Sequence, residues 1–308
     1  MCTAIGLSMG DRYFGRNLDL ECHFGECVTL TPRGFSFSLR AGGQLETRYA
    51  LLGMATSAGE FPLYAEAISE AGLGMAGLNF VGNAAFLGGR AAESTGVAVF
   101  ELIPWLLGQA ESLEEAEELL RKVTVLSIAP RPDLPTAELH WFLTDGEDTL
   151  VLECTREGMR VYQNPTGVLT NNPPFPYQLA RWNAMPQPQP KSPLDPALLG
   201  FCTESYGRDG DLLPGGYSSE ARFLRAAWLR ERVKPCDERE TARVAAAFSV
   251  LSSVAPPYGC VVGANGRMHY TLYSVVANLS RGRLYLRDTR GTEITSYGFS
   301  DTPSSPKS

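Results

Sequence analysis

The sequence lacks the segments that take a protein into or across a membrane. No stretch reaches the roughly 20 consecutive apolar residues that span a bilayer as a helix. One of the longest apolar runs, residues 96–107, is interrupted by Glu101 and Pro104. The first residues have neither the positive region nor the long apolar core of a signal peptide. We therefore expect a cytoplasmic protein with no membrane partner.

The chain also lacks a basic segment and the residue pairs of a metal site. Its 27 Lys and Arg against 34 Asp and Glu give a net charge of −7, which argues against nucleic acid as a partner. The seven cysteines include no Cys-x-x-Cys pair and only three histidines are present, so we expect no metal and no other cofactor. An odd number of cysteines is typical of reduced thiols rather than of a disulfide framework.

The patterns that are present predict many short strands. They indicate a hairpin over residues 3–15, a glycine-rich strand over 72–80, a meander of strands over 138–170 and a closing hairpin over 270–288. The strands fall into two blocks with helices between and after them. The βαβ alternation and the Gly-x-Gly-x-x-Gly motif of a doubly wound sheet are absent. The sequence therefore predicts a layered α+β fold.

Four helices are predicted between and after the strand blocks. The first covers residues 100–107, with a break or kink at Pro104. The second starts at Ser112, where a serine followed three residues later by glutamate forms a capping box. The other two cover residues 221–233 and 240–251, where apolar residues recur at helical spacing.

The most informative residue follows the initiator methionine. If Met1 is removed, which a small second residue permits, Cys2 becomes the first residue and carries a thiol beside its own α-amino group. Such an amine has an unperturbed pKa near ~7.7–8.0, a range suited to a base at neutral pH. An amine that activates its own side chain is the arrangement of an N-terminal nucleophile.

Six motifs in a fixed order make this interpretation specific. They are Met-Cys-Thr at 1–3, Phe-Gly-Arg-Asn-Leu-Asp at 14–19, Ala-Gly-Leu-Asn-Phe at 76–80, Leu-His-Trp at 139–141, Gly-Val-Leu-Thr-Asn at 167–171, and Leu-Pro-Gly then Ala-Arg-Phe-Leu-Arg at 213–225. In this order they resemble the choloylglycine hydrolase family, which contains conjugated bile salt hydrolases and penicillin V acylases. The resemblance runs from residue 1 to about residue 290.

The resemblance implies an N-terminal-nucleophile hydrolase with a four-layer αββα sandwich of two antiparallel sheets. It implies one domain over residues 1–300, without Met1, and we expect a disordered tail over 301–308. The matched site residues are the nucleophile Cys2, the arginines beside the thiol, Arg16 and Arg222, the carboxylate that holds the α-amine, Asp19, and the residues around the oxyanion, Asn79 and Asn171.

These residue types suit the implied chemistry. Attack of a thiol on an amide carbonyl produces an oxyanion, which preorganised N–H donors such as asparagine amides stabilise. A guanidinium group favours thiolate over thiol and never loses its own charge. Collapse of the intermediate yields a thioester and the free amine, and water then releases the acid.

The leading hypothesis for the substrate is a glycine- or taurine-conjugated bile acid. Asn79 favours it, because penicillin V acylases of this family often carry tyrosine at the matching position. A rigid steroid needs a wide apolar cleft beside the nucleophile. Candidate contacts in apolar loops near the motifs are Phe24, Phe61, Phe80, Phe86, Ile128 and Leu134. The resemblance also implies a homo-oligomer, a tetramer.

Three alternatives remain open. An acylase for penicillin V or N-acyl-homoserine lactones would use the same mechanism with another acyl pocket. A papain-like cysteine hydrolase would need a histidine base, and the sequence around His23, His140 and His269 does not support one. A non-catalytic ligand-binding protein that kept the fold would tolerate a blocked N-terminus, whereas the enzyme would not.

Overall fold

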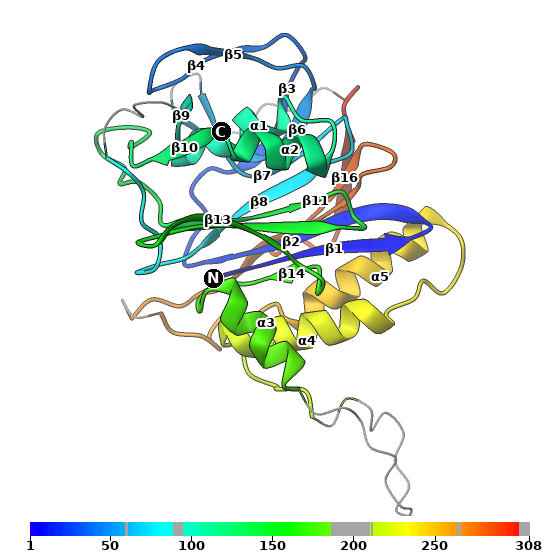
Figure 1. The fold of residues 1–308 in the computed structure, drawn as a ribbon. Helices are drawn as coiled ribbons and strands as arrows, with labels where there is room; N and C mark the ends of the chain where they lie inside the picture. The colour runs from blue at the N-terminus through cyan, green and yellow to red at the C-terminus, as the bar shows by residue number, and fades with distance from the viewer. Residues whose placement is uncertain (59–60, 89–94, 186–209, 211, 264–265, 302–308) are drawn as a thin grey trace, which may run out of the picture.

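Two antiparallel sheets lie face to face in the computed structural model, and helices cover both outer faces (Figure 1). The structure describes residues 1–58, 61–88, 95–185, 210, 212–263 and 266–301. Helices α1 (Leu102–Leu107) and α2 (Leu113–Leu120) cover one sheet. Helices α3 (Phe175–Asn183), α4 (Ser219–Arg232) and α5 (Glu240–Ser253) cover the other. The predicted αββα sandwich is confirmed.

The first sheet brings the two ends of the chain together. Its strands in spatial order are β14 (Val168–Leu169), β1 (Cys2–Met9), β2 (Asp11–Leu20), β15 (Tyr270–Asn278), β16 (Arg283–Asp288) and β17 (Ile294–Gly298). The β1–β2 hairpin turns at Gly10, whose φ of 83° suits glycine. Pairing of β2 with β15 places Thr271 opposite Asp19. The predicted amino-terminal and closing hairpins therefore lie side by side.

The second sheet is formed by the middle of the chain. Its strands in spatial order are β13 (Gly158–Gln163), β12 (Thr149–Thr155), β11 (Leu139–Thr144), β8 (Gly74–Asn79), β7 (Phe61–Ser69), β6 (Leu51–Ala58) and β3 (Cys27–Thr31). Gly74 of β8 allows the sheets to approach each other. A Cβ atom at Gly74 would lie 2.8 Å from Phe14 of the first sheet.

Two small ribbons lie outside these sheets. The strands β4 (Ser36–Ser38) and β5 (Gln44–Glu46) are antiparallel, and β9 (Thr95–Ala98) and β10 (Val123–Leu126) are parallel. The break expected at Pro104 is not found. A 3-10 turn, Val99–Glu101, changes to the α-helix α1 before this proline. Pro104 lies in the first turn of α1, where its missing N–H has no intrahelical partner to lose.

The apolar core has two parts. One lies between the sheets and beneath α4 and α5, and includes the stacked pair Phe14 and Phe142, whose ring centroids are 6.2 Å apart. The other lies between the second sheet and α1. In the described parts of the chain no helix is long and apolar enough to span a bilayer. The predicted tail falls outside the described residues apart from Asp301, so its disorder stays a prediction.

Candidate active site

Cys2 begins β1 at the end of the first sheet, and only 1% of its surface is exposed. Arg16, on the neighbouring strand β2, donates from Nη2 to the Cys2 sulfur at 3.3 Å. The same nitrogen donates to the Gly77 carbonyl on β8 at 2.9 Å. The guanidinium group therefore spans from one sheet to the other and places a fixed positive charge beside the sulfur.

Glu66 on β7 holds that guanidinium from its other side. It forms a buried ion pair with Arg16 Nη1 and accepts a hydrogen bond from the Tyr273 hydroxyl at 3.2 Å. Burial lowers the pKa of Arg16, but the Glu66 carboxylate and the Cys2 sulfur raise it by more. Sequence reasoning missed Glu66. The one signal for Glu66 in the sequence is its charge, because the residues on either side of it in β7 are apolar.

Arg222 reaches the nucleophile from α4 on the outer face of the first sheet. Its Nη1 donates to the Cys2 carbonyl oxygen and to Thr3 Oγ1, and its Nη2 donates to Asn171 Oδ1 at 2.7 Å. Burial lowers the pKa of Arg222, and Asp19 opposes that shift. Arg222 was expected beside the thiol, but its hydrogen bonds hold the backbone of Cys2 rather than its sulfur.

Asp19 lies in the buried middle of the same cluster. Its Oδ1 accepts from Thr271 Oγ1 at 2.7 Å, and its Oδ2 is 3.9 Å from Arg222 Nη1. Oδ2 is buried and has no hydrogen-bond partner among the described residues. Burial raises the pKa of Asp19, and Arg222 and Thr271 oppose it. The cluster thus contains a carboxylate oxygen free to accept a further proton donor.

Met1 extends the β1–β2 pairing by one residue. Its α-amino group donates to the Asp19 carbonyl oxygen at 2.5 Å, and its carbonyl oxygen accepts from the Asp19 N–H at 3.0 Å. The peptide N–H of Cys2 donates to Asn171 Oδ1 at 2.8 Å. Removal of Met1 would turn this N–H into an α-amine that faces Asn171 Oδ1.

The two asparagines meet at the mouth of the site. Asn171 Nδ2 donates to the Asn79 backbone carbonyl at 2.8 Å, and the Asn171 N–H donates to Ser219 Oγ at 2.8 Å. An amide NH₂ carries two hydrogens. One Nδ2 hydrogen of Asn171 is used by Asn79, so the other is available to a ligand.

A pocket of about 280 Å³ opens at this point. Asn79, Asn171 and Arg222 belong to its lining, and Met1 lies in it too. The rest of the lining is Val81, Asn172, Ser219, Val261, Val262, Gly263 and His269. Sequence reasoning missed Val261 and Val262. Val81 and Val262 lie in loops, where they are 60% and 59% exposed. Each is an apolar residue next to a glycine, and this is the one signal that the sequence offers for either.

None of the six predicted substrate contacts belongs to this lining. The side chains of Phe61, Phe80 and Phe86 pack in the core or against it, and their contact with a substrate stays a prediction. Phe80 is fully buried and stacked on His140, while Phe61 and Phe86 pack against the core beneath α1. An apolar residue in a sequence pattern fits a core and a cleft equally well.

The other three predicted contacts lie nearer the surface. Phe24 is 43% exposed in the loop between β2 and β3. Ile128 and Leu134 are half-buried in the segment that follows β10. All three stay predictions.

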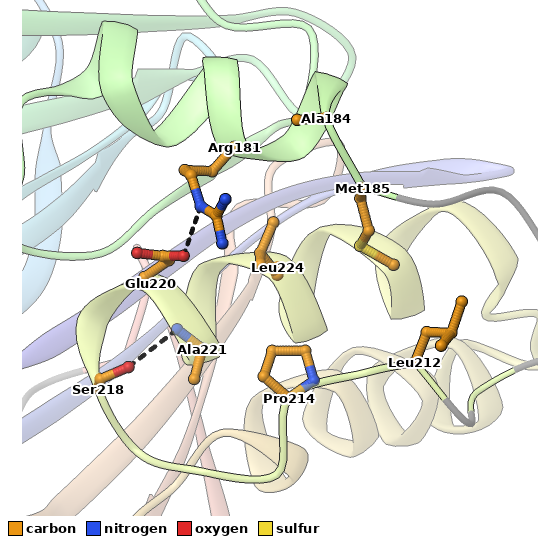
Figure 2. Close-up of a pocket in the computed structure, with 9 residues that line it drawn as sticks. All are labelled: Arg181, Ala184, Met185, Leu212, Pro214, Ser218, Glu220, Ala221 and Leu224. Carbon is orange, nitrogen blue, oxygen red and sulfur yellow. Dashed lines mark hydrogen bonds and ion pairs between the residues drawn. The ribbon is translucent and has the colours of Figure 1, made fainter.

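A larger pocket, of about 560 Å³, lies between α3 and α4 (Figure 2). Figure 2 shows the Arg181–Glu220 ion pair, with 2.6 Å between Nε and Oε1, on one side and Met185 and Leu224 within it. Its described lining includes none of the six matched site residues. Size alone therefore does not locate the chemistry of this protein.

Comparison with known proteins adds an independent finding. The family model described as linear amide C–N hydrolases, choloylglycine hydrolase family, matches residues 2–302. The bile salt hydrolase/transferase of Lactiplantibacillus plantarum is 37% identical over 298 residues, which cover 96% of this chain and 91% of the relative. The conjugated bile acid hydrolase of Lactobacillus gasseri is 30% identical over 317 residues, covering 98% and 96%.

Solved structures resemble the fold over nearly its full length. A mutant conjugated bile acid hydrolase from Clostridium perfringens matches with a TM-score of 0.84 and 27% identity, covering 100% of this chain and 97% of that one. Penicillin V acylase from Agrobacterium tumefaciens matches with a TM-score of 0.76, covering 97% and 86%. At 18% identity the second likeness concerns the fold alone.

Proposed function

The chain belongs to the choloylglycine hydrolase family of linear amide C–N hydrolases, and we propose that it hydrolyses glycine- or taurine-conjugated bile acids with Cys2 as the nucleophile. The substrate class is supported by relatives at 37% and 30% identity that are named for bile salts and conjugated bile acids. The mechanism rests on one observation above all. The sulfur of the residue after Met1 accepts a hydrogen bond from a buried arginine, while its backbone N–H is held by Asn171.

In the proposed mechanism, Met1 is removed first. The α-amine of Cys2 then takes the thiol proton, and Asp19 and Asn171 orient the amine. The sulfur attacks the amide carbon, and the oxyanion is stabilised by N–H donors at the pocket, among them Asn171 Nδ2. The protonated amine passes its proton to the leaving nitrogen as the C–N bond breaks. Water then gives a proton to the free α-amine as its oxygen attacks the thioester carbon, the C–S bond breaks, the sulfur takes that proton back, and the acid leaves.

The histidines support this mechanism over a papain-like one. His140 is buried with both ring nitrogens close to Glu153 and Thr170. His23 pairs with Glu26 in a loop. His269 lines the pocket, and its Nε2 is 3.4 Å from Glu21. A thiol–imidazole pair requires a ring nitrogen within hydrogen-bond reach of the sulfur, and in the described structure the sulfur's hydrogen-bond partner is Arg16.

Substrate choice is tested by a panel of amides with purified protein. We expect both glycocholate and taurocholate to be cleaved, because a net charge of −7 gives no steering toward either anionic end. Their kcat/KM values should agree within roughly two orders of magnitude, or about 2.7 kcal/mol. Much faster hydrolysis of penicillin V or of an N-acyl-homoserine lactone would replace the bile-acid proposal with the acylase alternative.

Replacement of Asn171 by alanine should lower kcat far more than it raises KM. The variant loses an oxyanion donor, a loss that typically costs ~2.7–4 kcal/mol of barrier, and it also loses the acceptor that holds the Cys2 nitrogen. Asn79→Ala should have a smaller effect, because its backbone carbonyl still binds Asn171. Steady-state kinetics of both variants are the measurement.

Asn172→Ala is the matched control. Asn172 lines the same pocket, but its side chain donates to the Val81 carbonyl at 2.7 Å and contacts no matched site residue in any described hydrogen bond. An effect of Asn171→Ala on KM alone would make Asn171 a substrate-positioning residue instead.

Three further expectations belong to the same proposal. Residues 1–300, after removal of Met1, form one catalytic domain. The protein acts in the cytoplasm, which agrees with the six described cysteines being free thiols. It assembles as a homotetramer, an expectation that rests on the family resemblance.

A further inference from the structure

His140 is a fully buried histidine that the proposed mechanism does not use. Its Nε2 is 3.0 Å from the Thr170 carbonyl oxygen, and its Nδ1 is 3.1 Å from Glu153 Oε1. Its ring is stacked on Phe80, with centroids 4.3 Å apart and planes 6° from parallel. Three separate segments thus meet at one imidazole.

Two of those contacts are chain neighbours of the site asparagines. Thr170 precedes Asn171, and Phe80 follows Asn79. Asn171 itself donates to the Asn79 carbonyl. The imidazole therefore contacts both asparagine-bearing segments, and the Asn171 side chain joins them a second time through the Asn79 carbonyl at the pocket.

The hydrogen-bond partners fix the number of protons on this pair. A carbonyl oxygen only accepts, so Nε2 must carry the proton that Thr170 receives. Glu153 Oε1 also accepts from the Phe175 N–H at 2.8 Å. With Nδ1 bare and Glu153 ionised, two acceptors would face each other at 3.1 Å. One more proton must lie between them, so His140 and Glu153 together have no net charge.

The other titratable groups beside Glu153 carry no charge that could balance a glutamate carboxylate. Burial raises the pKa of Cys154 to about 12, with Glu153 adding to the shift. Burial also raises the pKa of Tyr162, again with a contribution from Glu153. Both groups are neutral at physiological pH, so His140 is the partner that compensates the buried carboxyl group.

Glu153 extends the same network to the other side of Asn171. Glu153 accepts a hydrogen bond from the N–H of Phe175, the first residue of α3. Gln178 of the same helix donates to the Asn171 and Pro173 carbonyl oxygens. Asn171 is therefore tied to the pair through Thr170 on one side and through α3 on the other.

We propose that His140 and Glu153 are positioning residues for the hydrolysis: as a buried pair that shares one proton, they fix Asn79 and Asn171 in the arrangement that Cys2 requires. This inference rests on the proposed amide hydrolysis but not on the choice of bile acids. It assigns a role to the histidine of the Leu-His-Trp motif that is not acid–base catalysis.

Two double variants isolate the bond to Thr170. A glutamine amide nitrogen lies where histidine has Nε2, and an asparagine amide nitrogen lies where it has Nδ1. In a Glu153→Gln background, which removes the buried carboxyl group, His140→Gln keeps a donor for Thr170 and His140→Asn does not. Both variants lose the imidazole ring, so they differ in that donor.

We expect the asparagine double variant to have a kcat about 10-fold to 100-fold below that of the glutamine double variant, because a misplacement of reacting groups by about 1 Å can cost about 10²-fold in rate. KM should change little. Alkylation of Cys2 by iodoacetamide, followed on the N-terminal peptide, should proceed at equal rates, because displacement of iodide develops no oxyanion. Trp141→Phe is the stability control, because Trp141 follows His140 in the chain but packs in the other part of the core, between the second sheet and α1.

Equal kcat in the two folded double variants would overturn the inference, and so would alkylation rates that fall together with kcat. A wild-type protein that cleaves no amide would instead refute the proposed function. In that event ¹⁵N spectra of the imidazole rings still decide the matter, because the chain has three histidines and a His140 variant assigns the signal. A proton on Nε2 supports the inference, and a ring protonated on Nδ1 alone overturns it.

Discussion

Replacement of Cys2 by alanine should abolish hydrolysis of every amide substrate and leave the fold intact. The change removes one sulfur atom from a buried terminal residue of β1, so the hydrogen bonds of its backbone to Asn171 and Arg222 remain. Loss of a nucleophile that works together with its base lowers kcat by on the order of 10⁶-fold in well-studied hydrolases. Kinetics and a thermal unfolding curve measure the two halves of this prediction.

The matched control is Cys236→Ala. Cys236 is an exposed free thiol whose one described side-chain partner is Asp237, at 3.9 Å. This variant should keep most of the activity. Turnover by the Cys2 variant at a rate near that of the wild type would show that another group is the nucleophile.

A protein that keeps Met1, or any residue before Cys2, should be nearly inactive. The peptide nitrogen of an extended chain has no basic lone pair, and a general base typically contributes about 10²–10⁴-fold to the rate. Met1 also lies in the pocket beside Asn79 and Asn171, where it takes space from a substrate. Both effects act in the same direction, so the loss should exceed that of the base alone.

A removable tag makes this prediction quantitative. Protein with a tag before Cys2 is assayed, the tag is cut so that Cys2 becomes the first residue, and the same sample is assayed again. Activity should appear on cutting. A carboxyl-terminal tag treated with the same protease is the control, and full activity of the uncut amino-terminal fusion would rule out the α-amine as base.

Much of the fold could be predicted because its pattern is local. The first strand of the β1–β2 hairpin is an apolar, partly β-branched run that ends at a glycine turn, and α4 and α5 carry a helical apolar spacing. The strand β7 was missed, since it begins with Phe-Pro and contains Glu66, which is buried there because Arg16 of the other sheet neutralises it. The helix α3 was also missed, because Pro173, Pro174 and Pro176 around its start indicate a loop.

The site divides in the same way. Cys2, Arg16 and Asp19 lie in one hairpin, so their spacing in the sequence is enough to predict that they lie close together. Their meeting with Arg222 and Asn171 depends on how β14 and α4 pack against β1, which no local pattern contains. The pocket lining was hardest to predict, because the sequence cannot tell that Phe80 faces His140 while the neighbouring Val81 faces the pocket.

The most direct test of the account is a mass measurement on enzyme quenched with acid during turnover of glycocholate. The account predicts a chain lighter than the full translation product by one methionine. It also predicts that a fraction carries the mass of the acyl group on the peptide that begins with Cys2, and that hydroxylamine removes it as a thioester. An acyl group on any other residue, or on an active chain that retains Met1, would contradict the account.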